Sequence, residues 1–428
     1  FPSGGTDGME NDEWQERRTE SVNEKDTMKN SRKTNVKSNT SDIEAKEKKE
    51  QQEQEKILAA KYLIELIRSV LEERKPQPKP EKVSMKQLFL TAKNNNLICM
   101  AYDAFRQIAE PEDADIMKKW QKTSQSCTVM DVVQRSEGNK IFRAFTEQGE
   151  IRILPMKGWI MKGFYPRPEY RQMGDLDFLI DRENRKKARD IMCGMGYRFV
   201  KNECDDTVDV YKKEPWMYVE IHNHMTPYKN KTKYEKIWER CEKKDGLYAM
   251  NWDDYYMFML DHLEKHFYSS GCGVRFLLDL FIFMEKKGKE LHRDVLEKEF
   301  RIRGEENFFE QLEKTALSWF GKEYHVGDTR MEKLILVSGA FGTDSQKYTN
   351  RQEKIQKKYK NKKVAKAVYF LTRTFPEYSY MCNIYPFLYK APVLMPVMWI
   401  VRLICAPVTK MDRIRKEVGF WRKMGKKE

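Results

Sequence analysis

The chain has 428 residues, of which 40% are hydrophobic, so it has enough apolar side chains for at least one folded core. Lysine and arginine outnumber aspartate and glutamate by 80 to 66, and the resulting net charge of +14 favours anionic partners such as nucleotides, nucleic acids or membrane surfaces. The eight cysteines are scattered without C-x-x-C spacing, which argues against a disulfide framework and indicates a reducing compartment. No apolar stretch of the secretory type stands near the start, so we expect a cytoplasmic protein.

The N-terminal third is predicted to be a polar tail followed by helices. Residues 1–54 are almost entirely charged or polar, and we predict disorder because they cannot bury enough apolar surface to offset the entropy lost on ordering. The stretch "KILAAKYLIELIRSVLEER" (56–74) then has apolar residues at helical spacing and ends at a proline-rich break. Further helical segments extend this N-terminal helical region over residues 55–149.

The spacing of apolar residues changes near residue 150, where short strands begin to alternate with helices. The helices expected here are "KGWIMKGFY" (157–165) and "ENRKKARDIMCGMG" (183–196). The strands expected are "IRILPM" (151–156), "DLDFLID" (175–181), "YRFVKN" (197–202), "TVDVYKK" (207–213) and "WMYVEIHNHM" (216–225). Residues 150–248 are therefore predicted to form a small α/β core.

Residues 249–428 are again predicted to be helical, with a basic tail. Three helical segments are clear: "DYYMFMLDHLEKHFYSS" (254–270), "VRFLLDLFIFMEKKG" (274–288) and "LEKEFRIRGEENFFEQLEKTALSWF" (296–320). Prolines and Arg402 interrupt the apolar stretch "APVLMPVMWIVRLICAPV" (391–408), so we expect no transmembrane span. We favour a helix packed on the domain, with contact to a membrane surface through residues 391–428 as the alternative.

The stretch "GDLDFLID" (174–181) places two aspartates at the start of an apolar strand. Because residues i and i+2 of a strand face the same way, Asp175 and Asp177 are expected to point together from one face while the apolar residues between and after them point into the core. Two such carboxylates suit one or two Mg²⁺ or Mn²⁺ ions. The alternative is a polar strand entrance in which Asp175 caps the turn after Gly174.

A third acid stands in "YVEIHNH" (218–224), where Glu220 shares one strand face with His222. If this strand lies beside the first, Glu220 could be a further metal ligand or a general base. We expect His222 to support Glu220 by a hydrogen bond rather than to take part in the chemistry directly. An exposed strand residue without a function is the alternative for Glu220.

Lys157 and Gly158 stand at a strand-to-helix junction, where a backbone without a side chain, a helix start and a positive charge together suit phosphate groups. The Walker pattern G-x-x-x-x-G-K-[ST] is absent. A solvated lysine is the alternative for Lys157. His262 and His266 lie four residues apart but lack the H-E-x-x-H zinc pattern, so substrate contact and ordinary packing both stay open.

The stretch "LPMKGWIMKGFYPRPEYRQMGDLDFLI" (154–180) resembles the uncharacterised nucleotidyltransferase-like family of bacterial proteins, which belongs to the DNA polymerase β-like nucleotidyltransferase superfamily. Members of the family read roughly Leu-Lys-Gly, an apolar helix, Tyr-Pro, Arg and then Asp-x-Asp. The resemblance extends weakly over residues 85 to 425. It implies an α+β protein in which a small mixed β-sheet nucleotidyltransferase core is flanked by N-terminal and C-terminal helical regions.

The resemblance also implies a role for each site residue. Asp175 and Asp177 match the metal-binding pair and Glu220 the third acid, while the nucleotide-binding residues would be Lys157, Gly158 and Arg171. For Arg171, a salt bridge that positions the acidic strand is the alternative. The phosphate turn is Lys-Gly, 17 residues before Asp175, whereas the superfamily's usual turn is Gly-Ser or Gly-Gly about ten residues before the acids. This departure affects the expected triphosphate geometry more than the metal site.

The implied reaction is transfer of a nucleoside monophosphate from an NTP to an acceptor, with pyrophosphate leaving and Mg²⁺ or Mn²⁺ as cofactor. The sequence identifies neither the base of the NTP nor the acceptor, which is a small molecule, a protein or RNA. Two alternatives use the same fold without this reaction: a non-catalytic nucleotide-binding sensor and an interaction protein.

Overall fold

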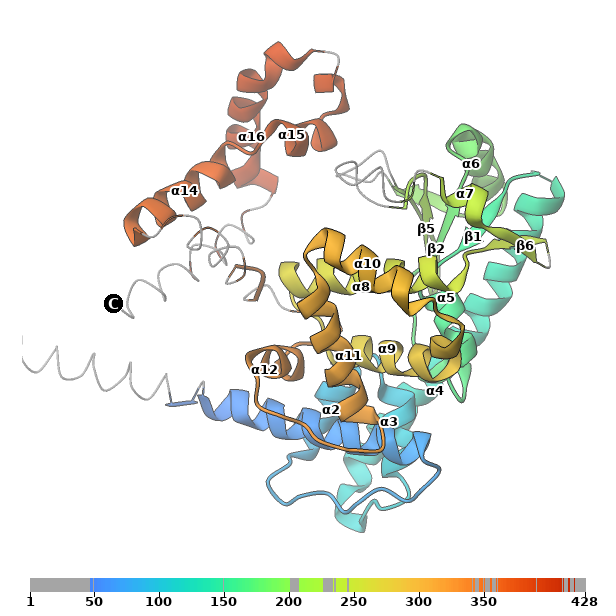
Figure 1. The fold of residues 1–428 in the computed structure, drawn as a ribbon, viewed down its shortest axis with the longest axis vertical. Helices are drawn as coiled ribbons and strands as arrows, with labels where there is room; N and C mark the ends of the chain where they lie inside the picture. Colours follow the sequence, from blue (N-terminus) through green and yellow to red (C-terminus); the bar gives the residue numbers. More distant parts are fainter. Residues whose placement is uncertain are drawn as a thin grey trace, which may run out of the picture. The chain divides into compact units, whose positions relative to one another are not determined.

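The computed structural model describes most residues between 47 and 409 (Figure 1). The residues left out of that span are 49, 149, 201–207, 226–233, 235, 245, 341, 343–345, 349, 351–354, 356–358, 360 and 390, and beyond it residues 411, 415 and 419 are described. The chain divides into two compact units, Phe1–Lys56 and Ile57–Glu428. The finer division predicted from the sequence stays a prediction.

The segment predicted to be disordered, residues 1–54, lies mostly outside the described residues. Its described residues, 47, 48 and 50–54, are helical, as are residues 55–71. Glutamate, lysine and glutamine have high helix propensity. The helix therefore begins in the polar sequence, before its first apolar residues.

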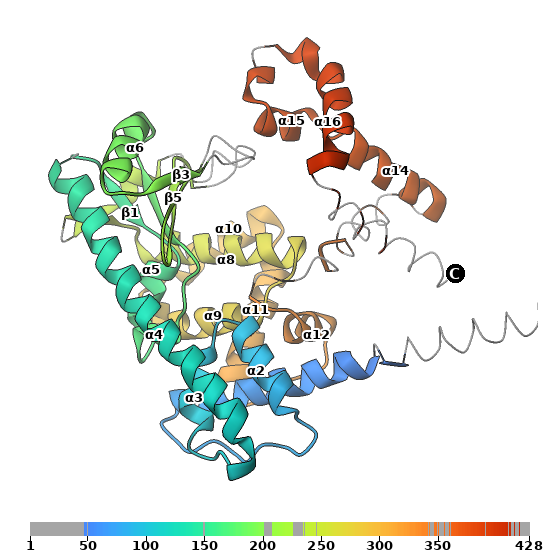
Figure 2. The same cartoon turned by 180° about the vertical axis from the view of Figure 1, so that it is seen from behind.

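The N-terminal helical region ends in one long helix that reaches the sheet. After the helical residues 57–71 come α2 (Met85–Asn94), α3 (Ile98–Phe105) and α4 (Ala114–Arg143), which continues into the π-helical turn Ala144–Gln148. Near its start α4 buries Trp120, whose Nε1 donates a hydrogen bond to the Ile98 carbonyl at 3.0 Å. Near its end α4 packs Phe142 edge-on against Phe178 of the sheet, with ring centroids 5.5 Å apart. Figure 2 shows α4 running along this side of the molecule.

The five-stranded sheet is mixed, with strand order β1-β2-β5-β4-β3. One pair of strands, β2 and β5, is parallel, and the other three pairs are antiparallel. The strands are β1 (Ile153–Pro155), β2 (Leu176–Ile180), β3 (Arg198–Val200), β4 (Val208–Lys213) and β5 (Met217–His222). All five lie within segments predicted to be strands, and the α+β class with a small mixed sheet between helices is confirmed.

The two faces of the sheet differ in chemistry. Leu176, Phe178 and Ile180 of β2 join Val219 and Ile221 of β5 in one apolar cluster, which α6 (Arg185–Gly194) and the end of α4 complete. The opposite face holds the residues between them in the strands, because neighbouring side chains alternate across a sheet. That second face carries the acidic residues of the candidate site.

Some local structure differs from the sequence prediction. The helix expected over 157–165 is split into α5 (Gly158–Met161) and the 3-10 turn Lys162–Phe164. A small hairpin, β6 (Glu242–Lys244) and β7 (Leu247–Ala249), follows the short helix α7 (Ile237–Arg240) and was not expected. The helix expected over 296–320 breaks at Gly304, whose φ of +66° suits glycine as a helix C-cap.

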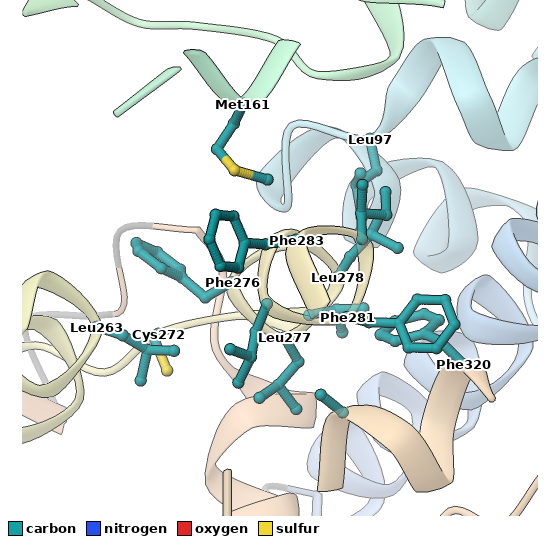
Figure 3. Packing of buried hydrophobic residues seen from close by; sticks show 14 of the residues in the cluster. Leu97, Met161, Leu263, Cys272, Phe276, Leu277, Leu278, Phe281, Phe283 and Phe320 are labelled. Carbon is teal, nitrogen blue, oxygen red and sulfur yellow. The ribbon is translucent and has the colours of Figure 1, made fainter. Parts of the chain in front are cut away.

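The helix α9 (Val274–Lys287) lies at the centre of the main hydrophobic core. Every residue from Val274 to Phe283 is buried, which is typical of a helix surrounded by other elements. Figure 3 shows Phe283 pointing toward Met161 and Phe281 lying beside Phe320. The neighbouring helices are α8 (Trp252–Ser269), α10 (Arg293–Arg303), α11 (Glu306–Phe320) and α12 (Arg330–Val337). Met161 follows Lys157 and Gly158, the candidates for the phosphate turn, so this core packs against the segment that contains them.

The last described helices are α14 (Lys362–Thr374), α15 (Tyr378–Ile384) and α16 (Met395–Thr409). Met381 and Cys382 of α15 form a small buried cluster with Leu388, and residues of α16 pack against it. Much of α16 is solvent-exposed. The expectation that the helix over 391–408 packs on the domain stays a prediction. No helix among the described residues is both long and apolar enough to cross a membrane.

Candidate active site

Two neighbouring parallel strands bring three ionisable side chains together. In the register of β2 and β5, Asp177 pairs with Glu220 and Leu179 pairs with His222. Side chains at paired positions point to the same face of a sheet. One ligand atom from each of Asp177, Glu220 and His222 lies within 4.8 Å of the other two. The strand pairing therefore builds a compact group of potential metal ligands.

Asp175 lies at the edge of this group rather than within it. The strand β2 begins at Leu176, so Asp175 occupies the bend before the strand and is half-buried. It is not one of the residues whose ligand atoms lie within 4.8 Å of one another. The expected alternation of Asp175 and Asp177 along one strand is thus replaced by a strand residue and a turn residue, because pairing with β5 starts only at Leu176.

Asp177 is deeply buried, with 4% of its surface exposed, whereas the sequence suggested a carboxylate outside the core. Burial alone would raise its pKa, but the charge of Lys157 and the hydrogen bond from His222 hold the pKa well below its ordinary value. Lys157 Nζ lies 2.5 Å from Asp177 Oδ1. Asp177 is therefore an ionised carboxylate that is stabilised by these two partners.

His222 supports Asp177, not Glu220 as the sequence suggested. Its Nε2 lies 3.0 Å from Asp177 Oδ1 and 3.8 Å from Glu220 Oε2. The hydrogen bond therefore crosses from β5 to β2 and depends on the register of the two strands. Burial lowers the pKa of His222, so its ring is neutral at pH 7 and Nε2–H donates to the carboxylate.

The group has an excess of negative charge. Burial and the charge of Asp177 raise the pKa of Asp175 to about 6. Burial and the charges of Asp177 and Asp175 likewise raise the pKa of Glu220 to about 7. Lys157 supplies the main positive charge near the three carboxylates, and the charges of Arg275 and Arg171 also act on Asp175. The pKa of Lys157 is raised because the charge of Asp177 outweighs the effect of burial. A further cation at this position would relieve the repulsion among the acids.

Lys157 reaches Asp177 from a strained turn. Its backbone has φ +45° and ψ −116°, a conformation that costs a residue with a side chain on the order of 1–3 kcal/mol. Two hydrogen bonds hold the turn in place. The Met156 N–H donates to the Asp177 carbonyl at 3.1 Å, and the Tyr255 hydroxyl of α8 donates to the Lys157 carbonyl at 3.0 Å. The surrounding structure therefore fixes this lysine against the acidic strand.

Gly158 is needed for packing within the protein. A Cβ atom on Gly158 would lie 2.7 Å from Met173 Cγ and 3.1 Å from Arg171 Nη1. The bare backbone expected to approach a ligand thus faces the interior on that side. The glycine lets the turn sit directly on the segment that leads into β2, so its role in phosphate binding stays a prediction.

Arg171 lies below the turn in a second charge cluster. Its Nε and Nη2 donate to the two carboxylate oxygens of Asp279 on α9, at 3.1 and 2.9 Å. Its Nη1 donates to the Gln172 carbonyl, and the Tyr165 hydroxyl donates to Asp279 Oδ1 at 2.7 Å. These contacts favour the positioning role that was the alternative for Arg171. Contact with a nucleotide stays a prediction.

The helix α4 fixes the segment between the turn and the acidic strand from the other side. Asp131 forms a buried ion pair with Lys162, and Gln134 donates from Nε2 to the Met173 carbonyl at 3.3 Å. A Cβ on Gly138 would lie 2.6 Å from the Trp159 ring, so α4 approaches this segment closely there. Residues 157–173 are thus held between α4 and the helices α8 and α9.

Sequence reasoning missed Asp279, Tyr165 and Tyr255. Asp279 gave a usable signal, because it is the one acid in the apolar run "FLLDLFIF" (276–283), and a buried carboxylate needs a partner. The two tyrosines gave none, since their hydroxyls find partners about 100 residues away in the chain. Long-range pairs of this kind leave no local pattern.

His262 and His266 of α8 pack edge-to-face, with ring centroids 4.5 Å apart, and both rings lie against Phe276. Burial, the charge of Lys157 and the neighbouring His266 lower the pKa of His262 well below its ordinary value. Packing beside the site is the role that these contacts support. Neither histidine belongs to the groups of potential metal ligands among the described residues.

Comparison with known proteins returns a family but no individual relative. Neither a curated protein nor a solved structure matches the chain. Residues 81–321, more than half of the chain, match the uncharacterised nucleotidyltransferase family. This range includes the turn at Lys157, both site strands and the supporting helices α4, α8 and α9. The chain therefore belongs to the uncharacterised nucleotidyltransferase family, as the resemblance in residues 154–180 indicated.

Proposed function

We propose that the protein is a metal-dependent nucleotidyltransferase that moves a nucleoside monophosphate from an NTP to an acceptor hydroxyl or phosphate and releases pyrophosphate. One observation carries the proposal. Asp177 and Glu220 meet from adjacent parallel strands, with Asp175 beside them, and the three carboxylates have more negative charge than Lys157 neutralises. Such a group is costly for a fold unless a cation uses it.

The donor set fits Mg²⁺ or Mn²⁺, because hard divalent ions prefer carboxylate oxygens. Asp177 and Glu220 would hold the ion directly, and Asp175 would add a ligand from the end of the strand. When bound, such an ion neutralises charge on the triphosphate and on the reacting oxygens. His222 keeps the Asp177 carboxylate oriented by the hydrogen bond between them.

The reaction forms a bond between an acceptor oxygen and the α-phosphorus of the NTP, and it breaks the bond from that phosphorus to the bridging oxygen of pyrophosphate. An acceptor hydroxyl must also lose its proton. Glu220, with a pKa near 7, is suited to take that proton. Its two assigned roles, general base and metal ligand, both predict loss of turnover when the carboxylate is replaced.

Lys157 is assigned to the triphosphate because it is charged, half-buried and at the edge of the acidic group. Binding of the NTP would draw the Lys157 ammonium away from Asp177 and toward a phosphate. Gly158 and Arg171 are assigned to the same turn: the glycine lets it pack closely, and the arginine anchors the segment beneath it.

The test uses the four NTPs, each labelled at the α-phosphate, with Mg²⁺ and three acceptor pools: RNA, protein and small metabolites. We expect label to move into one pool with the native chain and not with Asp177→Asn. Asp209→Asn is the matched control, because Asp209 is buried in β4 of the same sheet but pairs with Arg185 outside the site. Transfer by Asp177→Asn at the native rate would refute the proposal. NTP binding without transfer in any pool would support the sensor instead.

A further inference from the structure

We call the segment α14–α16 the C-terminal hairpin. Within it, the described contacts between α16 and the end of α14 lie on one side of α16. Trp399 of α16 donates from Nε1 to the Pro376 carbonyl at 3.1 Å, and its ring lies edge-on to Phe375 with centroids 5.5 Å apart. Arg402 Nη1 donates to the carbonyl of Arg373, at 2.9 Å. These contacts hold α16 against the end of α14. They define the inner side of α16 and leave its opposite side to be explained.

The opposite side of α16 is a continuous aliphatic surface. Four of its residues are between 37% and 69% exposed, namely Val397, Ile400, Val401 and Ile404. Their spacing of i, i+3, i+4 and i+7 places them on one face of the helix. We call these four residues the α16 stripe. Among the described residues α14 adds exposed apolar side chains seven positions apart, at Val364 and Leu371.

The positive charge of the chain is concentrated around the same helices. Residues 347–428 contain 20 lysines and arginines against 5 aspartates and glutamates, a net charge of +15. Residues 1–346 contain 60 against 61, a net charge of −1. The whole excess of positive charge in the protein therefore lies in its last 82 residues, the part of the sequence that contains the α16 stripe.

We propose that α14–α16, with the basic sequence around them, dock on an anionic phospholipid surface, with the α16 stripe inserted at the boundary between headgroups and acyl chains. A basic helix with an aliphatic face has the composition of helices that lie in the plane of a membrane. Each lysine or arginine near such a surface adds attraction to anionic lipids. The finding that no described helix could span a bilayer agrees with a helix that lies flat.

Other occupants fit the same surface less well. Nucleic acid would satisfy the positive charge, but aliphatic side chains offer neither the stacking nor the hydrogen bonds on which such binding depends. A second copy of the chain would cover the stripe, but it would bring a like charge of +15 against it. An anionic lipid surface satisfies both features at once.

The experiment is flotation of the full chain with vesicles of phosphatidylcholine alone or with about 30% phosphatidylglycerol, at low and physiological salt. We expect the chain to float with the anionic vesicles, at least tenfold less with phosphatidylcholine alone, and less as salt rises. The double variant Ile400→Asn with Ile404→Asn keeps the charge and should lower the partition coefficient at least tenfold.

The matched control is Val295→Asn with Ile302→Asn on α10. These residues are 56% and 72% exposed, seven positions apart, and outside the hairpin. The control should bind vesicles as the native chain does. Circular dichroism of both double variants should match the native spectrum, because all four side chains lie at the surface.

Four results would overturn the proposal. The first is an absence of binding to anionic vesicles, and the second is equal partition of the stripe variant and the native chain. The third is self-association of the native chain that the stripe variant abolishes, while neither protein binds vesicles. The fourth is vesicle binding that polyuridylate removes but the stripe substitutions do not. The third result would assign the stripe to a second copy, and the fourth would assign the basic sequence to nucleic acid. None of them depends on whether the protein transfers nucleotides.

Discussion

Two clusters of buried charge meet at the segment between Lys157 and Asp177, and they are balanced differently. In the Asp279 cluster, one carboxylate accepts hydrogen bonds from Nε and Nη2 of Arg171 and from the Tyr165 hydroxyl. In the Asp177 cluster, three carboxylates have one lysine and a neutral histidine beside them, with further positive charge from Arg275 and Arg171 at Asp175. The first cluster is neutralised by its own partners, and the second is not.

The difference indicates which cluster serves the fold and which serves a ligand. Burying a charge is costly unless it is paired, so a structural cluster is expected to satisfy its charges internally. The pKa values of Asp175 and Glu220 are raised first by burial and then by repulsion from the neighbouring carboxylates. A fold gains nothing from that repulsion, whereas a site that binds a divalent cation requires it.

The largest expected effect separates the two clusters by function. Glu220→Gln removes a charge from the Asp177 cluster but keeps the side-chain shape. Turnover should fall by about 10²–10⁴-fold, the range for loss of a general base. Stabilisation by NTP and Mg²⁺ should be weakened but not lost, because Lys157 and the other acids are intact. Steady-state turnover and a thermal shift measure the two effects. Unaltered turnover on the true acceptor would remove Glu220 from the site.

The second effect should appear in stability. Arg171→Met leaves the Asp279 carboxylate buried without its guanidinium, and breaking a buried pair in this way costs about 3–5 kcal/mol. Arg240→Met is the control, because Arg240 and its partner Asp254 are both more exposed, and it should cost about 1 kcal/mol or less. Urea unfolding measures both. If the two variants lose equal stability, the Asp279 cluster is not the structural anchor described here.

The third effect tests whether the excess charge receives a cation. Mg²⁺ with an NTP should stabilise the native chain by mass action, by about 2.7 kcal/mol at a ligand concentration of 100 Kd. The double variant Asp175→Asn with Asp177→Asn should lose this stabilisation. Thermal unfolding with and without the two ligands measures the difference, and Mg²⁺ alone serves as a further arm. A shift of native size in the double variant would exclude these acids as the metal site.

The sequence alone was sufficient for the local part of this comparison. Period-two alternation placed Glu220 and His222 on one face of a strand, and the apolar run after Asp177 identified the strand that begins the acidic site. Three features lay beyond it. The hydrogen bond of His222 depends on the strand register, the burial of Asp177 depends on helices over the sheet, and the partner of Arg171 lies 108 residues away. Each arises from contacts between distant segments, which periodicity does not encode.

The smallest expected effect concerns the backbone that links the two clusters. Lys157 adopts a positive φ that glycine tolerates without strain. The variants Lys157→Ala and Lys157→Gly both lose the ammonium beside Asp177, so their difference isolates the backbone. Relief of strain is worth about 1–3 kcal/mol, and glycine loses about 0.5–1 kcal/mol more chain entropy on folding, so Lys157→Gly should be more stable than Lys157→Ala by about 1 kcal/mol.

Urea unfolding of the two variants measures that difference, and NTP binding by each measures what the strain accomplishes. Both variants should bind NTP more weakly than the native chain, because neither presents a charge to the triphosphate. If Lys157→Ala proves the more stable variant, the turn is not strained, and the lysine needs no functional reason for its conformation. If the expected order holds, the fold keeps an unfavourable backbone at this one position because the side chain it carries must reach the acidic strand. The conformation of the turn would then serve the function of the Asp177 cluster, although the residues that hold the turn in place, Arg171 and Tyr255, serve the fold.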